Sequence, residues 1–259
     1  MTPDEGKDPV PVIEHVKRAL EAGKIAGLDP PPLGTSLRGL FSTGGMSGSY
    51  QSGRTVSKPS EAAEISKTGD VGIEALREEL RDCRRCKLWQ GRTNIVFGEG
   101  SPQARLVFVG EGPGREEDLQ GRPFVGDAGK MLTKIITNGM GLSREDVYIC
   151  NVVKCRPPGN RDPEQDEVAA CLPFLTAQLA AIKPEVICVL GRVAGIVLLG
   201  KEFKITRDRG RWYSYNGIPL MPTFHPAYIL RGTGREREIK KLVWDDIKQV
   251  MKRMGLEVG

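Results

Sequence analysis

The sequence predicts an α/β fold in three layers, with a central four-stranded, mostly parallel sheet flanked by helices. Four short apolar segments end in glycine-rich or polar turns, as buried strands do: residues 104–114, 146–155, 184–195 and 217–228. Stretches with helical periodicity lie between and after them, at about 127–140, 164–182, 191–199 and 235–253. Strands that alternate with helices favour parallel pairing and a sheet covered on both faces. An Asn216-Gly217 pair in front of the fourth segment is typical of a hairpin turn.

The first 70 residues predict an N-terminal extension outside this fold. Residues 12–24 have the pattern of a short helix, and residues 27–70 are rich in Gly, Ser and Pro, with one Phe, one Tyr and no Trp or Cys. Such a segment buries too little apolar surface to offset the entropy of ordering it, so we expect a flexible linker. The folded domain should occupy residues 71–259 and begin with an amphipathic helix at 72–83.

Composition and charge restrict the class of protein. No apolar run approaches the roughly 20 residues that a membrane span needs. The N-terminus has no basic start followed by an apolar core, so we expect a cytoplasmic protein without a secretory signal. Residues 1–82 carry a net charge of −3 and the remainder +8. A basic C-terminal part favours a polyanionic partner.

The six cysteines favour metal binding or catalysis over disulfides in a cytoplasmic chain of this length. Four of them form a widely spaced set: Cys83, Cys86, Cys155 and Cys171. Four thiolates suit tetrahedral zinc or a [4Fe–4S] cluster equally well by number, although the second pair is too widely spaced for a zinc ribbon. Unligated thiols are the third alternative. Cys150 and Cys188 lie inside apolar strands and should be small buried hydrophobes.

Candidate functional residues follow the predicted strands. They are Glu111, Gly112, Gly114, Asn151, Gly191 and His225. Ligands of open parallel sheets bind beyond the carboxyl ends of the strands, where these residues should meet. A glycine-rich turn alone is weak evidence, because such turns are common. The shared position of all six predicts one functional rim.

Four segments, in this order, resemble the family 4 uracil-DNA glycosylases, which are the iron–sulfur members of their superfamily. They are CRRC at 83–86, GEGPGREEDLQGRPFVGDAGKML at 110–132, NVVKCRPPGNRDPEQDEVAAC at 151–171 and HPAYILR at 225–231. The resemblance covers roughly residues 75–255 and leaves the first 70 outside it. It implies a four-stranded parallel sheet between helices, and an enzyme that hydrolyses the bond between uracil N1 and deoxyribose C1′ in DNA.

The resemblance also implies a cofactor. Cys83, Cys86, Cys155 and Cys171 match the four ligands of the family's [4Fe–4S] cluster, so CRRC would be half of that site. The cluster would be structural and would hold the chain segments that flank the DNA groove, with a redox role left open. The arginines of CRRC and Lys87 would lie near DNA phosphates.

Base recognition would involve an aromatic residue and an amide, since a base must be flipped out of the duplex into a pocket. Phe124 is similar to the family's stacking residue; a plain core phenylalanine is the alternative. Asn151 can donate to uracil O4 and accept from N3–H, and cytosine presents the opposite pattern; a structural capping role is the alternative. Gly110, Gly112 and Gly114 would let the backbone approach the flipped nucleotide closely.

Catalysis would separate a cationic sugar from anionic uracil. His225 matches the family histidine that donates to uracil O2, and it can do so while neutral. The best-known relatives have an Asp at the position of Gly112. Family 4 members commonly have a glycine there, as this chain does, and this departure leaves the water-positioning residue open. We favour Glu111 for this role, with Glu117 as support. The alternative for Glu117 is a carboxylate that complements a helix dipole.

The HPAYILR segment would lie against the minor groove, with Tyr228 or Ile229 as a wedge in the base stack and Arg231 on a phosphate. The expected partner is uracil-containing DNA, single- or double-stranded, bound by a monomer. The N-terminal extension would be a tether to a clamp or repair protein, or an inert tail.

Three other functions stay open at this point. A cross-linking subgroup of the superfamily traps the abasic sugar through a histidine-bearing insertion, which this chain lacks after Asn151. A redox iron–sulfur protein would give Phe124, Asn151 and His225 no shared purpose. A non-catalytic module would bind DNA without releasing uracil.

Overall fold

The computed structural model describes residues 72–231 and 234–258, and the expected extension over residues 1–70 lies outside them. Its centre is a six-stranded mixed sheet in the order β1-β3-β2-β4-β6-β5. The strands are β1 (Glu99–Gly100), β2 (Leu106–Gly110), β3 (Tyr148–Asn151), β4 (Val186–Leu190), β5 (Tyr213–Tyr215) and β6 (Ile218–Thr223).

The prediction of four strands is wrong in number. The four predicted segments form β2, β3, β4 and β6, and neighbouring strands among them are parallel. Two antiparallel edge strands are added: β1 pairs with β3, and β5 with β6. These edges are two and three residues long, too short to show an alternating apolar pattern. The predicted hairpin between β5 and β6 is confirmed, and Asn216 and Gly217 have the positive φ angles that it requires, 50° and 80°.

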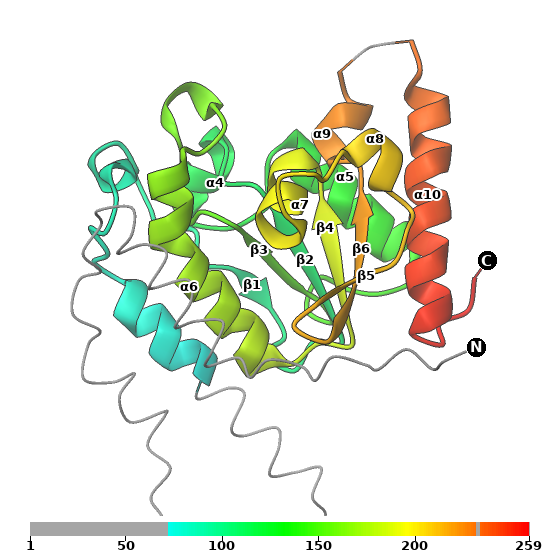
Figure 1. Cartoon of the computed structure of the whole chain (residues 1–259), viewed down its shortest axis with the longest axis horizontal. Coiled ribbons are helices and arrows are strands. Elements are labelled where there is room, and N and C mark those ends of the chain that lie inside the picture. The colour runs from blue at the N-terminus through cyan, green and yellow to red at the C-terminus, as the bar shows by residue number, and fades with distance from the viewer. Residues whose placement is uncertain (1–71, 232–233, 259) are drawn as a thin grey trace, which may run out of the picture.

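Helices cover both faces of the sheet (Figure 1). One face carries a helix at 72–80, α6 (Gln165–Ile182) and α7 (Arg192–Leu199). The other carries α5 (Asp127–Lys134), the turn η2 (Ile135–Gly139) that continues it, α9 (Pro226–Ile229) and α10 (Glu236–Arg253). The remaining elements are η1 (Lys87–Gln90), α4 (Arg115–Gln120), η3 (Pro158–Asn160) and α8 (Ile205–Asp208). The four helices predicted after residue 120 are confirmed, with small shifts at their ends.

The two faces of the sheet pack into separate hydrophobic clusters, because side chains alternate along each strand. Val107 and Val109 of β2 join the cluster under α6, whereas Leu106 and Phe108 join the cluster under α5 and α10. Every residue of β2 and β4 is buried. Burial stabilises the fold by about 1.5–3 kcal/mol for each large aliphatic side chain, and a slip of one residue would exchange the two faces. The register therefore fixes where each strand ends.

The long helix α6 begins at a capping box. The Glu164 carboxylate accepts from the Glu167 backbone, and the Glu167 carboxylate accepts from the Glu164 amide at 2.7 Å. The helix ends at Lys183, which has a left-handed conformation. Between these ends α6 presents Cys171 and Gln178 to the protein interior. In the part of the chain that the structure describes, no helix is long and apolar enough to cross a membrane.

Candidate functional site

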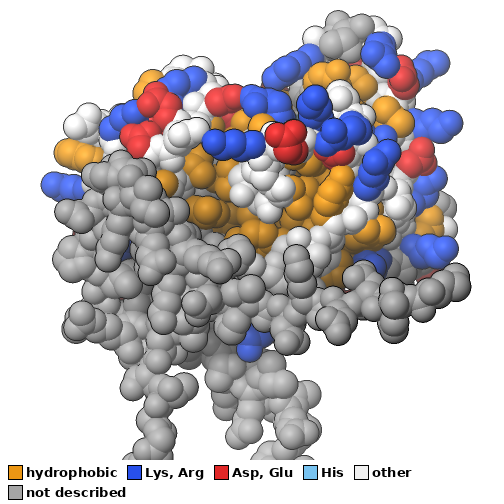
Figure 2. Space-filling model, viewed as in Figure 1, with side chains coloured by type: hydrophobic (Ala, Val, Ile, Leu, Met, Phe, Trp, Pro, Cys, Tyr) orange, Lys and Arg blue, Asp and Glu red, His pale blue; other side chains and the backbone are white. Residues whose placement is uncertain are grey.

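A cleft of about 630 Å³ opens at the carboxyl ends of the parallel strands. Residues chosen from the sequence line it together: Glu111, Gly112, Gly114, Glu117, Phe124, Asn151, Gly191, His225, Tyr228 and Arg231. The predicted rim is therefore one cavity in space. Figure 2 shows Lys and Arg side chains gathered along the upper edge of the molecule, above an apolar region of the same face.

Gly110 lets the aromatic and the amide side chains come together. A Cβ atom at this position would lie 2.4 Å from Asn151 Oδ1 and 2.5 Å from Phe124 Cζ, closer than any real Cβ contact. Only glycine fits at the end of β2, so the two side chains meet above it. Gly191 plays the same part on the other side, with φ of 93° and room for no Cβ beside His225.

Asn151 carries an unsatisfied acceptor. Its side chain is 1% exposed, and Oδ1 is the one buried side-chain oxygen or nitrogen among the described residues without a hydrogen-bond partner. An unpaired buried acceptor costs about 1–3 kcal/mol, so it favours a ligand that brings a hydrogen-bond donor. Oδ1 therefore caps no backbone amide.

Phe124 has an unusual backbone conformation for an aromatic residue, with φ of 52°. Its ring lies in the cleft and contacts the ring of His225. It also belongs to the hydrophobic cluster under α5 and is only 6% exposed. A ring that is fixed from behind and open to a cleft on one side is suited to stacking on a flat ligand.

His225 caps the N-terminus of α9, and its Nδ1 accepts a hydrogen bond from the Ala227 amide at 3.2 Å. The proton of the neutral ring therefore sits on Nε2, which is free to donate. Burial is the main cause that lowers the pKa of His225 to about 4; the Arg231 charge contributes to this shift and the Glu117 carboxylate opposes it. The imidazole is neutral at physiological pH.

Glu111 is half-buried beside the end of β2. Burial is the main cause that raises its pKa to about 7, and the nearby Asp162 carboxylate adds to the shift. Arg192 and Arg231 act in the opposite direction. Asp162 is itself paired with Arg192 at the mouth of the cleft. A carboxylate with this pKa can both take up and release a proton near neutral pH.

Glu117 holds the backbone of the following loop. Its Oε1 accepts from the Val125 amide at 2.9 Å and from the Gly126 amide at 2.8 Å. Its other oxygen faces Gly114, where a Cβ would lie 2.8 Å away. Glu117 thus lines the cleft and fixes the segment that carries Phe124.

The HPAYILR segment forms α9 and the residues after it. Tyr228 is half-buried against Phe224, with ring centroids 4.9 Å apart, and Arg231 lines the cleft. Ile229 is 2% exposed, so its side chain packs inward and does not present a wedge. Leu230, which the sequence analysis did not select, is 45% exposed.

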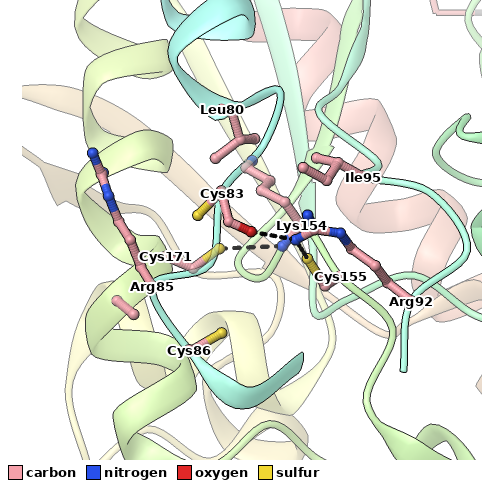
Figure 3. Close-up of a pocket in the computed structure, with 10 residues that line it drawn as sticks. Leu80, Cys83, Arg85, Cys86, Arg92, Ile95, Lys154, Cys155 and Cys171 are labelled. Atoms are coloured by element: carbon pink, nitrogen blue, oxygen red, sulfur yellow. Dashed lines mark hydrogen bonds between the residues drawn. The ribbon is translucent and has the colours of Figure 1, made fainter. Parts of the chain in front are cut away.

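A second, small cavity lies between the end of the helix at 72–80, the segments on either side of η1, the loop after β3, and α6. All four predicted ligands line it: Cys83, Cys86, Cys155 and Cys171 (Figure 3). The four cysteines are separated by up to 88 positions along the chain, yet they share one cavity. Cys150 and Cys188 are buried in β3 and β4 and do not line it, as predicted.

The surroundings of these cysteines fit thiolates whose charge is balanced by a bound metal group. Burial raises the pKa of Cys86 and Cys155, and that of Cys171 to about 12, so bare thiolates would be unfavourable there. Two donors nevertheless point at sulfur: Arg92 Nη1 at 3.4 Å from Cys155 Sγ, and the Lys154 amide at 3.3 Å from Cys171 Sγ. Within the described ranges no three His, Cys, Asp or Glu side chains are grouped to hold a single metal ion.

The basic residues of CRRCKLW are largely paired with the protein. Arg85 binds Glu79 at 2.8 Å and covers the Phe174 ring, and Lys87 pairs with Glu164 and Asp166. These contacts hold the segment against α6. They favour a structural role over the expected contact with phosphates.

Lys154 was missed by the sequence analysis. It is 1% exposed, and its Nζ donates to the Asn151 carbonyl at 2.8 Å and to Gln178 Oε1 at 2.6 Å. Gln178 in turn donates to Tyr148 and to the Phe97 carbonyl. This network joins the cleft to the cysteine cavity, which Lys154 also lines. Lysine is rarely buried, so its type alone gave no signal.

Comparison with known proteins identifies the family. The family model described as the uracil DNA glycosylase superfamily matches residues 97–248. A type-4 uracil-DNA glycosylase of Thermotoga maritima is 49% identical over 179 residues, covering 68% of this chain and 92% of that protein. Those of Sulfurisphaera tokodaii and Saccharolobus solfataricus are 47% and 44% identical, and cover 69% and 71% of this chain and 83% and 87% of their own lengths.

Proposed function

Because this chain belongs to the uracil-DNA glycosylase superfamily, among its type-4 members, we infer that it excises uracil from DNA. It is a hydrolase that acts on the N-glycosidic bond, in base-excision repair. The observation that carries this function is the convergence of Phe124, Asn151 and His225 on one cleft at the end of the sheet. An extruded base needs such a stacking face, a polar reader and a donor in one pocket.

Base selection rests on Asn151. Its unpaired Oδ1 accepts from uracil N3–H, and its amide nitrogen donates to O4. Cytosine presents an acceptor at N3 and a donor at C4, so both contacts would become repulsive. Phe124 stacks on the base and holds it in the plane that these bonds need.

Cleavage of the C1′–N1 bond leaves its electron pair on uracil and a cationic centre at the sugar. His225 donates from Nε2 to uracil O2, where negative charge develops, and a preorganised donor of this kind lowers the barrier. Glu111 in its ionised form orients the water that adds to C1′ and takes up the proton that this water loses. Glu117 supports the reaction by fixing the loop that carries Phe124.

Cys83, Cys86, Cys155 and Cys171 would hold a [4Fe–4S] cluster. Their common cavity, the four-thiolate donor set and the two donors aimed at sulfur support this assignment. The bound cluster would tie three separate chain segments together, those of Cys83 and Cys86, Cys155, and Cys171, and supply structural stability. Cys155 lies four residues after Asn151, so this support reaches the base pocket through the backbone.

DNA binds along the basic rim, with a phosphate near Arg231, which lines the cleft. Leu230 is a better wedge than Ile229 by exposure, and Tyr228 forms the cleft wall behind it. The enzyme acts as a monomer in the cytoplasm, where cysteine thiols stay reduced. Residues 1–70 are a tether to another repair protein or an inert tail.

Incubation of the purified full-length chain with a uracil-containing oligonucleotide, followed by alkaline cleavage, tests the function. We expect release of free uracil and strand breaks at the former uracil position. Asn151→Ala, His225→Ala and Glu111→Gln should each lose activity and retain the brown absorbance of the cluster. Binding without uracil release, or a protein–DNA adduct that survives SDS, would contradict the assignment.

A further inference from the structure

Phe124 is held in a backbone conformation that its own side chain disfavours. Its φ of 52° lies in the left-handed region, and the other described non-glycine residues there are two asparagines and a lysine: Asn160, Asn216 and Lys183. A bulky residue in this region is strained and persists only when its surroundings determine it. The groups that hold this backbone conformation matter, because the backbone sets the direction of the Phe124 ring.

Arg144 binds the two carbonyl groups on either side of the strained residue. Its Nη2 donates to the Pro123 carbonyl at 2.8 Å, and its Nη1 donates to the Phe124 carbonyl at 3.2 Å. Nη1 also donates to Thr133 Oγ1 at 3.0 Å, which ties the same guanidinium to α5. The planar fork of arginine matches two adjacent carbonyls in a way that a single ammonium cannot.

Glu99 orients Arg144 from the edge strand β1. Its Oε1 accepts from Arg144 Nε at 3.2 Å and from Nη2 at 3.1 Å. The Arg144 and Glu99 side chains are 14% and 23% exposed, so water screens this pair only partly. Arg122 binds the same carboxylate at 2.6 Å, but its side chain is 58% exposed and donates no hydrogen bond to the two carbonyls.

The amide side of the loop is held by an opposite charge, because Glu117 accepts from the Val125 and Gly126 amides. A cation therefore binds the carbonyls before the turn and an anion binds the amides after it. Neither Arg144 nor Glu99 lines the cleft, and neither belongs to the segments that carry the family resemblance. Apart from its pair with Glu99, the Arg144 guanidinium donates to the loop of Phe124 and to Thr133 of α5.

We propose that Arg144, oriented by Glu99, is a positioning residue that holds Phe124 in its left-handed conformation and so aims the ring at the flipped base. This inference rests on the stacking role of Phe124 under the proposed function. Arg144 touches neither base nor sugar. It acts through Phe124, and its loss should matter only while the ring is present.

A double-mutant cycle with a matched control tests the proposal. Arg144→Met should lower kcat/KM for uracil excision by about 10- to 100-fold, in the range expected when a binding group is displaced by about 1 Å. Arg122→Met, which removes the other partner of Glu99, should change it by less than about twofold. In a Phe124→Ala background, Arg144→Met should add less than about twofold. Equal losses in both backgrounds, or equal losses for Arg144→Met and Arg122→Met, would overturn the proposal.

A second readout does not depend on activity. With 4-fluorophenylalanine placed at position 124, the wild-type chain and Arg122→Met should give one sharp ¹⁹F resonance at the same shift. Arg144→Met should shift or broaden that resonance, because the ring would no longer have one orientation. An unchanged resonance in a folded Arg144→Met protein would sink the idea even if activity fell.

If Arg144→Met fails to fold, Arg144→Lys takes its place, because lysine retains the charge but not the planar fork of donors. We expect an intermediate loss of kcat/KM and a shifted ¹⁹F resonance. Wild-type values for both measurements would refute the role of the guanidinium fork. A wild-type chain that does not excise uracil would refute the proposed function, while the ¹⁹F comparison would still decide whether Arg144 positions Phe124.

Discussion

The rings of Phe124 and His225 lie with their centroids 5.6 Å apart and their planes inclined by 33°. This is the contact distance of an aromatic pair, which leaves no room for a base between the two rings. Under the proposed function, uracil would therefore meet Phe124 through its face and His225 through its edge. Because His225 Nδ1 accepts from the Ala227 amide, the neutral ring carries its proton on Nε2 and would offer that donor to the edge of the base.

The pH dependence of the reaction should report Glu111. Its pKa of about 7 means that the carboxylate needed to orient water is mostly protonated at pH 6 and mostly ionised at pH 8. Single-turnover rates should rise through about pH 7 and level off above it. His225 stays neutral across this window because its pKa is about 4, so it adds no limb there. In Glu111→Gln the residual rate should be flat between pH 6 and 8; a rising limb that persists would assign it to another group.

Asn151→Ala should lower the rate of uracil excision by about 10²–10³-fold, the usual loss when one preorganised donor or acceptor of a reacting group is removed. The unfolding free energy should change little or rise, because the variant removes a buried acceptor that has no partner. Thr206→Ala is a suitable control, since Thr206 is an exposed residue of α8 that lines the same cleft. Similar losses in the two variants would contradict base reading by Asn151.

Comparing alanine variants of two buried cysteines, Cys171 and Cys188, distinguishes loss of cluster binding from loss of core packing. Cys171→Ala should abolish the brown absorbance and lower the melting temperature by several degrees, because Cys171 lines the cavity that the four cysteines share. Cys188→Ala should retain the absorbance and lose only about 1 kcal/mol, the cost of a small core cavity. Iron content and thermal unfolding of the two proteins provide the measurement. Full iron content in Cys171→Ala would exclude it as a ligand.

Leu230→Ala should impair excision from double-stranded DNA about tenfold and from single-stranded DNA by less than twofold. A wedge compensates for a base that has left its stack, and a single strand has little stack to repair. Leu119 of α4 is similarly exposed, at 50%, and lies outside the cleft. Leu119→Ala should therefore affect excision from neither substrate. Equal losses on both substrates would assign Leu230 to binding in general.

Gly129→Ala should lower both activity and stability. A Cβ at this position would lie 1.9 Å from the carbonyl carbon and oxygen of Phe124, so the loop must move. Alanine favours a helix over glycine by about 1 kcal/mol, and a net destabilisation would therefore measure the clash. Gly91→Ala, where no atom lies within 4 Å of the new Cβ, is the control. Chemical denaturation and single-turnover kinetics of both variants test this, and a fully active Gly129→Ala would refute it.

The inner strands and the rim were predictable because buried parallel strands leave a plain pattern. β2 and β4 are apolar at every position, and the polar or glycine residues that follow them must lie at one edge of the sheet. Glu99–Gly100 was not predictable, because a two-residue edge has no periodicity. The family resemblance, and not the pattern, supplied the roles of Phe124 and His225.

Buried charges account for most of what the sequence did not reveal. Lys154 and Arg144 look like surface residues, and their partners Gln178 and Phe124 lie 24 and 20 positions away. Nothing in local composition indicates that such a residue will be enclosed and bound to backbone carbonyls. The exposure of Leu230 and the burial of Ile229 likewise follow from how α9 packs on α5, which is a tertiary property.

Asn151 and Cys155 belong to one short segment, and Lys154 between them binds the Asn151 carbonyl. If the cysteines hold an iron–sulfur cluster as proposed, a molecule without the cluster has also lost part of the support for Asn151. Specific activity should then scale with the iron stoichiometry of a preparation, and turnover numbers normalised to total protein would understate the enzyme. In a cell starved of iron, mutational load from deaminated cytosine would rise without any change in the abundance of this polypeptide.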